Sequence, residues 1–372
     1  MTVQSSAGGG RILVRGVNWL GDAVMTTPAL MRLREARPNA HITLLTPSKL
    51  AELWQSHPAI TAVMPVEPGE TLFQTARRLR EGRFDTAVVF PNSPRSALEV
   101  FLGGVPERIG LARRWRTWAL TKPVAPRAQE VDTRRRSTSE VRRLVREQPT
   151  KPRDTYSDSA HQIRDYLHIA ASLGANPTPV APVIAIRDDE VAAARKRFGA
   201  TEGRPLFGLN PGAEYGLAKR WPVERFVEAA RVVFEQTNCQ WWVFGNSSEV
   251  PLAESIVEKL PKGAAQSLAG KTSLRELCAA LKACAVVLTN DTGPMHLAAA
   301  VGTPVVVPFG STSPELTGPG WPPGAGHELL RGQAPCAPCF RRECPIDFRC
   351  MTSIPVDHVV QPVLRVFLRK QT

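Results

Sequence analysis

The sequence predicts an α/β protein made of two doubly wound domains that face each other across a cleft. Short apolar stretches alternate with amphipathic helical stretches along most of the chain, which is typical of parallel sheets covered by helices on both faces. The apolar stretches contain few polar residues, as strands buried on both faces require. Proline-rich residues 175–186 divide the alternation into two series, and 372 residues suffice for two domains of ordinary size.

The first series begins as strand, helix and strand directly after a polar opening of ten residues, which is expected to be a loose tail. Pro28 lies inside the first helical stretch and is expected to kink the helix or to restart it after Thr27. The predicted elements of this series are strands at 11–16, 41–47, 61–66 and 84–93 and helices at 22–38, around 71–82 and at 159–174.

The second series follows the proline-rich stretch, which is interpreted as an extended linker. The first domain is therefore placed at residues 1–180 and the second at 181–354, with a C-terminal helix at 355–372. The predicted elements of the second domain are strands at 206–212, 239–246, 284–291 and 304–310 and helices at 188–198, 222–236, 248–260, 273–282 and 294–301.

The charge is strongly positive and unevenly distributed. The net charge is +13, and residues 127–153 carry nine basic and four acidic residues, including Arg134, Arg135 and Arg136. A solvated loop with short helices, contact with an anionic lipid surface or phosphorylated acceptor, and nucleic acid binding stay open for this insertion. Nucleic acid is the weakest reading, because no aromatic residues are interleaved with the basic run. The polar opening does not have the pattern of a secretory signal, and no membrane-spanning stretch is expected.

The loop after the first strand resembles a phosphate-binding loop and then departs from it. Gly16 and Gly21 have the G-x-x-x-x-G spacing, but Asp22 follows where a nucleotide triphosphatase carries lysine. An acid at this position is suited to remove a proton rather than to bind phosphate. A plain helix N-cap is the alternative role for Asp22.

Two loops of the second domain offer groups suited to a diphosphate. Residues 210–222 present Lys219 and Arg220 before a helix opened by Pro222, although a solvated lysine explains the same pattern. Residues 289–300 start a helix with Thr292 or Gly293 as cap and Pro294 at its first position, and free amides at a helix start favour anions. His296 is expected either as a donor or as a structural residue, and Asp291 either caps the turn or binds a ligand hydroxyl.

Four motifs occur together in a recognisable order. They read NWLGDAVMTTPAL (18–30), PNSPRSAL (91–98), NPGAEYGLAKRWP (210–222) and NDTGPMHLAAAVGTPVVVPFGSTSPE (290–315). On these motifs the chain resembles the heptosyltransferases of glycosyltransferase family 9 from about residue 11 to its C-terminus. The resemblance implies the GT-B fold, an ADP-L-glycero-D-manno-heptose donor and an acceptor on the heptosylated Kdo-lipid A inner core of lipopolysaccharide. It also implies work at the cytoplasmic face of the inner membrane.

The resemblance assigns roles to individual residues. Asp22 matches the proposed catalytic aspartate of the family, with Asn18 beside it on the acceptor side, and Lys219 is expected to stabilise the departing ADP. No metal or other cofactor is required for this chemistry, and the C-terminal helix is expected to pack back on the first domain. The basic residues 134–136 are candidates for contact with the acceptor or the membrane. The candidate donor-binding residues are Gly212, Glu214, Tyr215, Glu249, Thr272, Asp291, Thr292, Gly293, Pro294 and His296.

Two segments depart from the best-known family members, namely the basic insertion and a cysteine-rich stretch. Cys336, Cys339, Cys344 and Cys350 have the spacing C-x2-C-x4-C-x5-C, which is dense enough for one tetrahedral zinc site. A structural zinc, reduced cysteines in a surface loop, and disulfides or an iron–sulfur cluster stay open. Cys239, Cys278 and Cys284 fall in strand or helix patterns and are expected in the core.

Alternative functions remain open at this point. An oxidoreductase that binds a dinucleotide is poorly supported, because neither domain carries G-x-G-x-x-G after its first strand. A non-catalytic sugar-nucleotide-binding protein would share the two-domain architecture without needing Asp22. A family 9 transferase with another acceptor, such as Kdo-lipid A, is the third alternative, since the departures leave acceptor specificity undecided.

Overall fold

The structure, a computed structural model, describes residues 10–131, 133–148 and 156–369 and contains two compact units. Unit 1 comprises Met1–Glu130 and Gln162–Ala185, and unit 2 comprises Val131–His161 and Ile186–Thr372. The predicted boundary at residue 180 lies close to the last crossing of the chain at 185. The expected loose tail falls almost entirely in residues 1–9, which lie outside the described residues.

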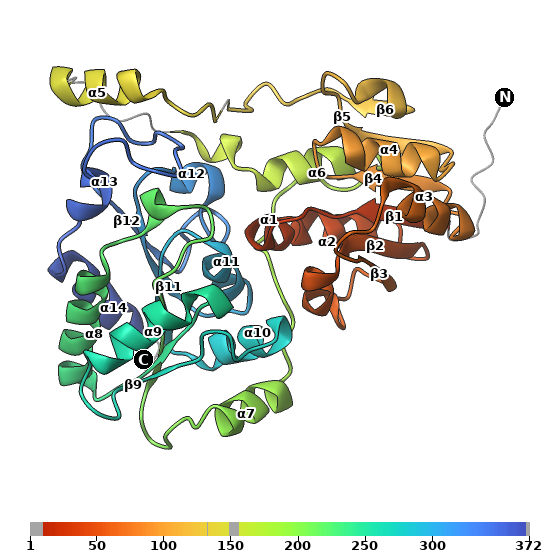
Figure 1. The fold of residues 1–372 in the computed structure, drawn as a ribbon. Helices are drawn as coiled ribbons and strands as arrows, with labels where there is room; N and C mark the ends of the chain where they lie inside the picture. Colours follow the sequence, from red (N-terminus) through yellow and green to blue (C-terminus); the bar gives the residue numbers. More distant parts are fainter. Residues whose placement is uncertain (1–9, 132, 149–155, 370–372) are drawn as a thin grey trace. The chain divides into compact units, whose positions relative to one another are not determined.

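Unit 1 is built on a six-stranded sheet whose paired strands are all parallel (Figure 1). The sheet order is β3-β2-β1-β4-β5-β6, so the first strand lies beside the fourth, as in a Rossmann-like sheet. The four strands predicted for this half are confirmed. The strands are β1 (Arg11–Arg15), β2 (His41–Pro47), β3 (Ala62–Val66), β4 (Thr86–Val89), β5 (Glu107–Leu111) and β6 (Lys122–Val124), and the helices are α1 (Leu20–Met25), α2 (Thr27–Ala36), α3 (Leu72–Glu81), α4 (Pro94–Leu102) and α6 (Ile163–Ala171), with 3-10 turns η1 (Ser48–Trp54) and η2 (Thr117–Ala119).

The predicted restart of the first helix near Pro28 is confirmed. Thr26 separates α1 from α2, and Pro28 occupies the second position of α2, where the missing N–H leaves no hydrogen bond of the helix unmade. The side-chain hydroxyls of Thr26 and Thr27 donate to the carbonyls of Ala23 and Val24 at 2.7 and 2.8 Å. These side-chain bonds add to those of the Thr26 backbone N–H at the end of α1 and so stabilise the junction of the two helices.

Unit 2 repeats the same winding with a second parallel sheet of six strands. Its order, β12-β11-β10-β7-β8-β9, again places the first strand of the unit beside the fourth. The predicted strands and helices of this half are confirmed within a few residues. The strands are β7 (Leu206–Asn210), β8 (Gln240–Val243), β9 (Ala265–Ser267), β10 (Val286–Thr289), β11 (Val305–Phe309) and β12 (Glu328–Arg331), and the helices are α5 (Thr138–Glu147), α7 (Asp188–Arg197), α8 (Val223–Thr237), α9 (Val250–Glu258), α10 (Leu274–Ala283), α11 (Gly293–Ala300), α12 (Pro314–Thr317), α13 (Arg349–Thr352) and α14 (Asp357–Arg369), with 3-10 turns η3 (Asp158–Ala160), η4 (Leu217–Lys219) and η5 (Ser247–Glu249).

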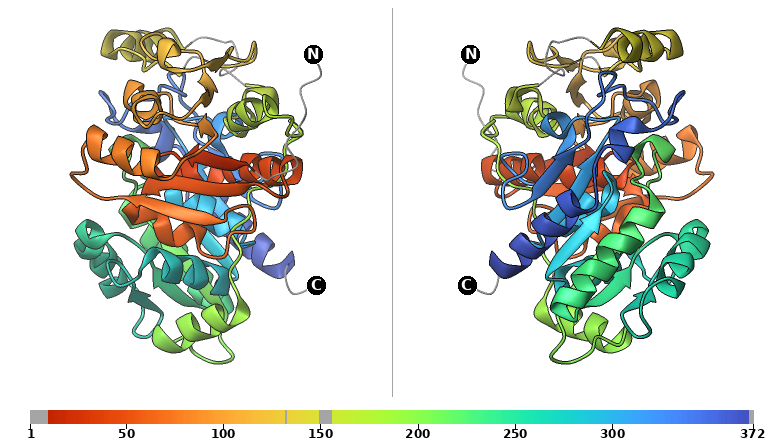
Figure 2. Two further views of the ribbon diagram at one scale, coloured as in Figure 1. Left: turned by 90° about the vertical axis from the view of Figure 1, so that its right-hand side faces the viewer. Right: turned by 90° about the vertical axis from the view of Figure 1, so that its left-hand side faces the viewer.

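The C-terminal helix packs on unit 2, so the expectation that it packs back on the first domain is wrong. α14 contacts α8 and strands β10, β11 and β12, and Figure 2 shows α14 in blue beside α8 in green. The apolar residues Val359, Val363 and Phe367 lie in the hydrophobic core of unit 2. Burial of this apolar stripe by the helices and strands of its own unit explains the position of the helix.

The basic insertion belongs to unit 2 from Val131 onward, although the prediction assigned all of it to the first domain. Val141 of α5 is 1% exposed and lies in the same core cluster as Cys336 and Cys339. The prediction of a loop with short helices is confirmed by α5 within the described part of the insertion. No helix among residues 10–131, 133–148 and 156–369 is long and apolar enough to cross a bilayer.

Candidate active site

The candidate site of unit 2 lies where β7 and β10 are neighbours. These two strands are parallel and adjacent, and the strand order reverses between them, which is where open α/β sheets bind ligands. Asn290, which follows β10, hydrogen-bonds to the loop that follows β7. Its side-chain amide donates to the carbonyl of Pro211 at 2.7 Å, and its oxygen accepts the N–H of Trp221 at 2.9 Å. The loop that carries Lys219 is therefore anchored at both of its ends.

Lys219 and Asp291 form a buried ion pair at this point. The Lys219 Nζ lies 2.6 Å from the Asp291 Oδ2, and the two side chains are 13% and 4% exposed. Thr312 donates its hydroxyl to the same carboxylate, and the Lys219 Nζ lies 4.8 Å from the centre of the Tyr215 ring. An ammonium has three N–H donors, so a lysine fixed on Asp291 keeps donors for an anionic ligand.

The start of α11 supplies backbone donors next to Asp291. Thr292 is the N-cap residue, and Pro294 occupies the second helical position rather than the predicted first one. Burial lowers the pKa of His296 to about 4, and the charge of Asp291 only partly offsets that effect. His296 is therefore neutral at physiological pH and acts at most as a neutral hydrogen-bonding group.

Glu249 is engaged in local contacts at the end of β8. Its Oε2 accepts the N–H of Asn246 at 3.0 Å in a capping box, and its Oε1 lies 3.6 Å from the guanidinium of Arg220. A Cβ on residue 212 would lie 1.9 Å from Glu249 Oε1, so a larger residue there would displace the Glu249 carboxylate. Gly212 and Glu249 thus lie together as predicted donor-binding residues. Glu214 is exposed, and Thr272 is half-buried ahead of α10.

Asp22 lines a pocket of about 250 Å³ in unit 1. It lies in the first turn of α1, whose N-cap residue is Trp19, so Asp22 is not the N-cap that the alternative reading required. Gly21 lies inside the same helix, so the glycine spacing does not form an open phosphate loop. The pocket lies beyond the carboxyl ends of β1 and β4, and its lining includes Val17, Asn18, Trp19, Pro91, Asn92, Ser93 and Leu111.

Three polar residues of this pocket were missed by the sequence analysis. Gln162 donates from its Nε2 to Asp22 Oδ1 at 3.3 Å and to Tyr166 Oη at 2.7 Å. Burial, followed by the charge of Asp22, raises the pKa of Tyr166 well above its usual value. Asp165 is the second carboxylate of the pocket, and it pairs with Arg127 at 2.7 Å. The side chain of Asp22 is thus positioned by α6, more than one hundred residues away in sequence.

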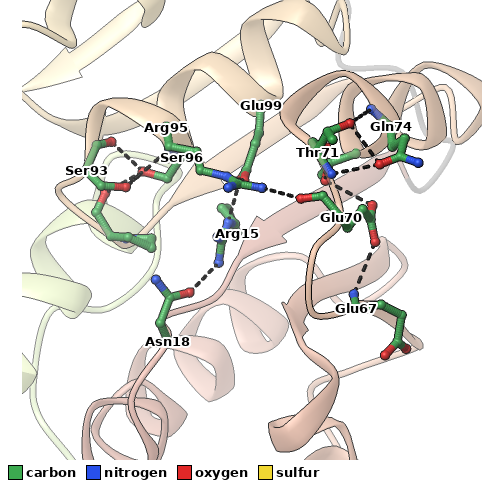
Figure 3. Close-up of polar contacts among 12 residues, drawn as sticks. Arg15, Asn18, Glu67, Glu70, Thr71, Gln74, Ser93, Arg95, Ser96 and Glu99 are labelled. Atoms are coloured by element: carbon green, nitrogen blue, oxygen red, sulfur yellow. Dashed lines mark hydrogen bonds and ion pairs between the residues drawn. The ribbon is translucent and has the colours of Figure 1, made fainter.

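A buried ion pair beneath the pocket supports Asn18 (Figure 3). The Glu99 carboxylate is 0% exposed and lies 2.7 Å from Arg15 Nε on one side and 3.1 Å from Arg95 Nε on the other. Arg15 in turn donates to Asn18 Oδ1 at 3.2 Å. Figure 3 shows this chain of contacts running from Arg95 through Glu99 and Arg15 to Asn18. These contacts hold Asn18 in the loop that leads into α1, the helix that carries Asp22.

The predicted basic triplet is divided between exposed and structural positions. Arg134 and Arg135 are exposed, whereas Arg136 donates from its NH1 to the carbonyl of Cys336 at 3.1 Å and from its backbone to that of Cys339 at 3.1 Å. Arg136 thus joins the basic insertion to the cysteine-rich segment within unit 2. A role of the triplet toward acceptor or membrane stays a prediction.

The cysteine-rich segment also supports the Lys219 loop. Tyr215 Oη donates to the carbonyl of Phe340 at 2.9 Å, and the Ala218 N–H donates to that of Arg342 at 2.9 Å. Gly216 has φ +148°, and a Cβ there would lie 2.4 Å from the same Arg342 oxygen. The backbone between Cys339 and Cys344 therefore packs against the Lys219 loop.

The four cysteines of this segment do not form a ready metal site. Burial raises the pKa of Cys336 and Cys339, and the nearby Cys344 raises both further, so these three thiols lie near one another. Among the described residues, no group of three or more His, Cys, Asp or Glu side chains is arranged to hold a metal ion. Zinc binding by Cys336, Cys339, Cys344 and Cys350 stays a prediction. Cys239, Cys278 and Cys284 are buried, as expected.

Comparison with known proteins identifies the family of this chain. Residues 72–348 match the family described as glycosyltransferase family 9 (heptosyltransferase). The chain belongs to this family. It is a glycosyltransferase of the GT-B fold, which confirms the resemblance seen in the four motifs.

Individual relatives agree with this assignment along most of the chain. The lipopolysaccharide heptosyltransferase 2 of Escherichia coli K12 is 30% identical over 319 residues, covering 83% of this chain and 85% of the relative. The lipooligosaccharide heptosyltransferase 2 of Haemophilus influenzae is 29% identical, with 83% and 85% coverage. The structure of E. coli ADP-heptose lipopolysaccharide heptosyltransferase II is similar with a TM-score of 0.77 and 25% identity, covering 97% of this chain and 100% of that one.

Proposed function

We propose that this glycosyltransferase moves L-glycero-D-manno-heptose from ADP-heptose to a hydroxyl of the heptosylated Kdo-lipid A inner core of lipopolysaccharide, with inversion at the anomeric carbon. The observation that carries the mechanism is the place of Asp22, which lines a polar pocket at the carboxyl edge of the unit 1 sheet. The names of the relatives, which include ADP-heptose and lipopolysaccharide, support the choice of donor and acceptor. The chain is proposed to work at the cytoplasmic face of the inner membrane.

Asp22 is proposed as the general base. The acceptor oxygen attacks the anomeric carbon and gives its proton to the Asp22 carboxylate, while the bond between that carbon and the diphosphate oxygen breaks and ADP leaves with the electron pair. A positioned base contributes about 10²–10⁴-fold in rate. Gln162 supports this role, because its amide donates to Asp22 Oδ1 and so orients the carboxylate within the pocket.

Unit 2 is proposed to bind the donor and to stabilise departing ADP. Lys219, held on Asp291 at 2.6 Å, and the amides at the start of α11 supply positive charge where negative charge develops. Because Lys219 is fixed before the ligand arrives, little reorganisation is needed during the reaction. Gly212 and Glu249 lie beside this loop, and with Glu214, Tyr215, Thr272, Thr292, Gly293, Pro294 and His296 they complete the proposed donor site. No metal or other cofactor is assigned a role in transfer.

Replacement of the two pocket carboxylates tests the base assignment. Asp22→Asn is expected to lower turnover at least about 10²-fold while ADP binding stays as in the parent protein. Asp165→Asn serves as the matched control, because Asp165 lines the same pocket but is paired with Arg127 at 2.7 Å. Turnover of the Asp22→Asn variant within about threefold of the parent would contradict the assignment.

Thermal stability in the presence of nucleotides tests the donor class. A ligand at about 100 times its dissociation constant adds roughly 2.7 kcal/mol to the free energy of unfolding. ADP and ADP-heptose are expected to stabilise the protein, and Lys219→Ala is expected to reduce this effect together with transfer. Stabilisation by NAD alone, or by UDP-sugars in preference to ADP-heptose, would overturn the proposed donor.

A further inference from the structure

An aromatic and basic surface of unit 1 has no role in the reaction described above. We call it the Trp115 surface, and it consists of Phe101, Arg108, Arg114, Trp115 and Trp118. Trp115 is 82% exposed, Trp118 63% and Phe101 38%, and Arg114 is exposed as well. Large aromatic side chains gathered at the surface of a protein mark a site of interaction.

Packing and hydrogen bonds hold several side chains of the Trp115 surface in place. The rings of Phe101 and Trp118 pack edge to face with centroids 5.3 Å apart, and the guanidinium of Arg108 lies 5.3 Å from the centre of the Phe101 ring. Arg108 also donates to the carbonyl of Ala119 at 2.7 Å. Beneath it, Ala97 of α4 forms a small core with Ala119 and Leu120. The aromatic side chains are therefore presented to solvent by packed structure between α4 and η2.

The segment that carries Trp115 and Trp118 is basic. Arg113 in it pairs with Glu130 and Arg116 is buried, so Arg114 is the arginine left exposed beside Trp115. From Arg108 to Lys122 the chain carries five basic residues and no acidic one. Trp115 lies directly between Arg114 and Arg116 and has a positive φ of 72°. Tryptophan and arginine in combination suit the boundary of an anionic bilayer, where the ring lies at headgroup level and the cation meets lipid phosphate.

One end of the Trp115 surface follows a strand that reaches the pocket containing Asp22. The segment 112–118 leaves the carboxyl end of β5 (Figure 1), and Leu111 at that end lines the pocket. Arg116, which is 1% exposed, donates from its NH1 to the carbonyl of Pro91, another lining residue. Arg114 and Trp115 therefore follow closely after this pocket-lining strand end, whereas Phe101, Arg108 and Trp118 lie toward the amino ends of β5 and β6.

We propose that the Trp115 surface docks on the headgroups of an anionic lipid bilayer and so brings the Asp22 pocket to a lipid-linked acceptor. This inference rests on the proposed function, since a lipid-linked acceptor presents its sugars just above the bilayer. Trp115 enters the interface, Trp118 and Phe101 widen the apolar contact, and Arg114 pairs with lipid phosphate. The surface belongs to unit 1, in contrast to the basic insertion, whose Arg136 is bound within unit 2.

Sedimentation of the full chain with vesicles tests the proposal directly. The parent protein is expected to bind vesicles of phosphatidylglycerol and phosphatidylethanolamine, and to bind phosphatidylcholine vesicles at least about tenfold more weakly, with a strong decrease in high salt. Trp115→Ser together with Trp118→Ser is expected to weaken binding about tenfold or more. Trp115→Ser alone, at the more exposed position, is expected to weaken it in the same direction without disturbing the packing against Phe101.

Phe73→Ser is the matched control, because Phe73 is 74% exposed on α3 of the same unit, a helix that carries Arg77 and Glu81 and therefore both signs of charge. It is expected to leave vesicle binding unchanged. Equal binding of parent and Trp115→Ser protein, an equal loss on Phe73→Ser, or equal binding to phosphatidylcholine would overturn the proposal. Self-association that disappears in the double variant would also overturn it, in favour of a second copy of this chain as the occupant.

Two acceptors separate this proposal from the proposed function. With a water-soluble inner-core oligosaccharide, the double variant is expected to transfer heptose at the parent rate. With lipid-bearing acceptor in phosphatidylglycerol vesicles, its kcat/KM is expected to fall about tenfold. An equal fall with both acceptors would overturn the docking role, whereas absence of transfer by the parent protein to either acceptor would contradict the proposed function and leave the vesicle-binding result standing.

Discussion

Replacing Glu99 with glutamine is expected to lower the free energy of unfolding by about 3–5 kcal/mol, the loss typical when one partner of a buried ion pair is removed. The magnitude follows from burial, since the Glu99 side chain is 0% exposed and that of its partner Arg15 is 7% exposed. The neutral amide leaves the Arg15 guanidinium buried without a compensating charge. For a unit of this size, about 3 kcal/mol corresponds to a fall of roughly 6–12 °C in the melting temperature.

Scanning calorimetry and urea denaturation measure this loss, and Arg95→Gln is the matched control. Arg95 pairs with the other oxygen of the same carboxylate but is 54% exposed, so its replacement is expected to lower stability by only about 0.2–1 kcal/mol. The Glu99→Gln variant is also expected to raise the acceptor KM, because Arg15 holds Asn18 at the pocket. A loss below about 1 kcal/mol for Glu99→Gln, or an equal loss for both variants, would refute the reasoning.

Three further predictions concern pH, the donor loop and metal content. Burial lowers the pKa of His57 to about 4, so below about pH 6.5 the unfolded chain binds a proton that the folded chain does not, and stability falls. Denaturation experiments on His57→Gln are expected to show that the free energy of unfolding differs between pH 7 and pH 5 by about 2 kcal/mol less than in the parent protein. Gly216→Ala, which places a Cβ 2.4 Å from the Arg342 carbonyl oxygen, is expected to weaken ADP binding about tenfold in titration calorimetry, whereas Gly263→Ala, also at positive φ but with nothing within 4 Å, leaves it unchanged; equal affinities would contradict the role of that contact. Metal analysis of the purified protein is expected to find about one zinc per chain if the cysteine-rich segment binds metal, and a stoichiometry far below one in folded protein would dismiss that prediction.

The two parallel sheets and eight of the twelve strands among the described residues were predictable because buried parallel strands leave a local signature, whereas β5, β6, β9 and β12 were not predicted. Continuous apolar stretches such as residues 286–289 are followed by loops rich in glycine and polar residues, and each loop falls at the carboxyl end of its strand. The break near Pro28 was predictable for the same reason, since the effect of proline on a helix is local. Asp22 in the first turn of α1 and Lys219 in η4 follow shortly after such strands, so their places could be predicted as well.

The partners of amphipathic helices could not be predicted from their pattern. The apolar face of α14 shows that the helix packs on something, but burial is not directional, and the choice of unit 2 depends on the surfaces available there. The same holds for α5, whose single buried residue Val141 joins the core of unit 2. Gln162 and Tyr166 were missed because polar residues in an amphipathic helix also suit its solvent face, and their contact with Asp22 depends on packing between α2 and α6.

The chain passes from one unit to the other three times, after residues 130, 161 and 185. Neither half of the enzyme is therefore a continuous stretch of sequence, and a single cut near residue 185 would separate α5 from the core that it completes. A fragment that starts at residue 186 lacks Val141, so the core residues that pack with it, Cys336 and Cys339 among them, would be more exposed to water. Donor binding by an isolated C-terminal half is best studied with residues 131–161 rejoined to it through a designed linker, and the N-terminal half needs a short bridge between residues 130 and 162.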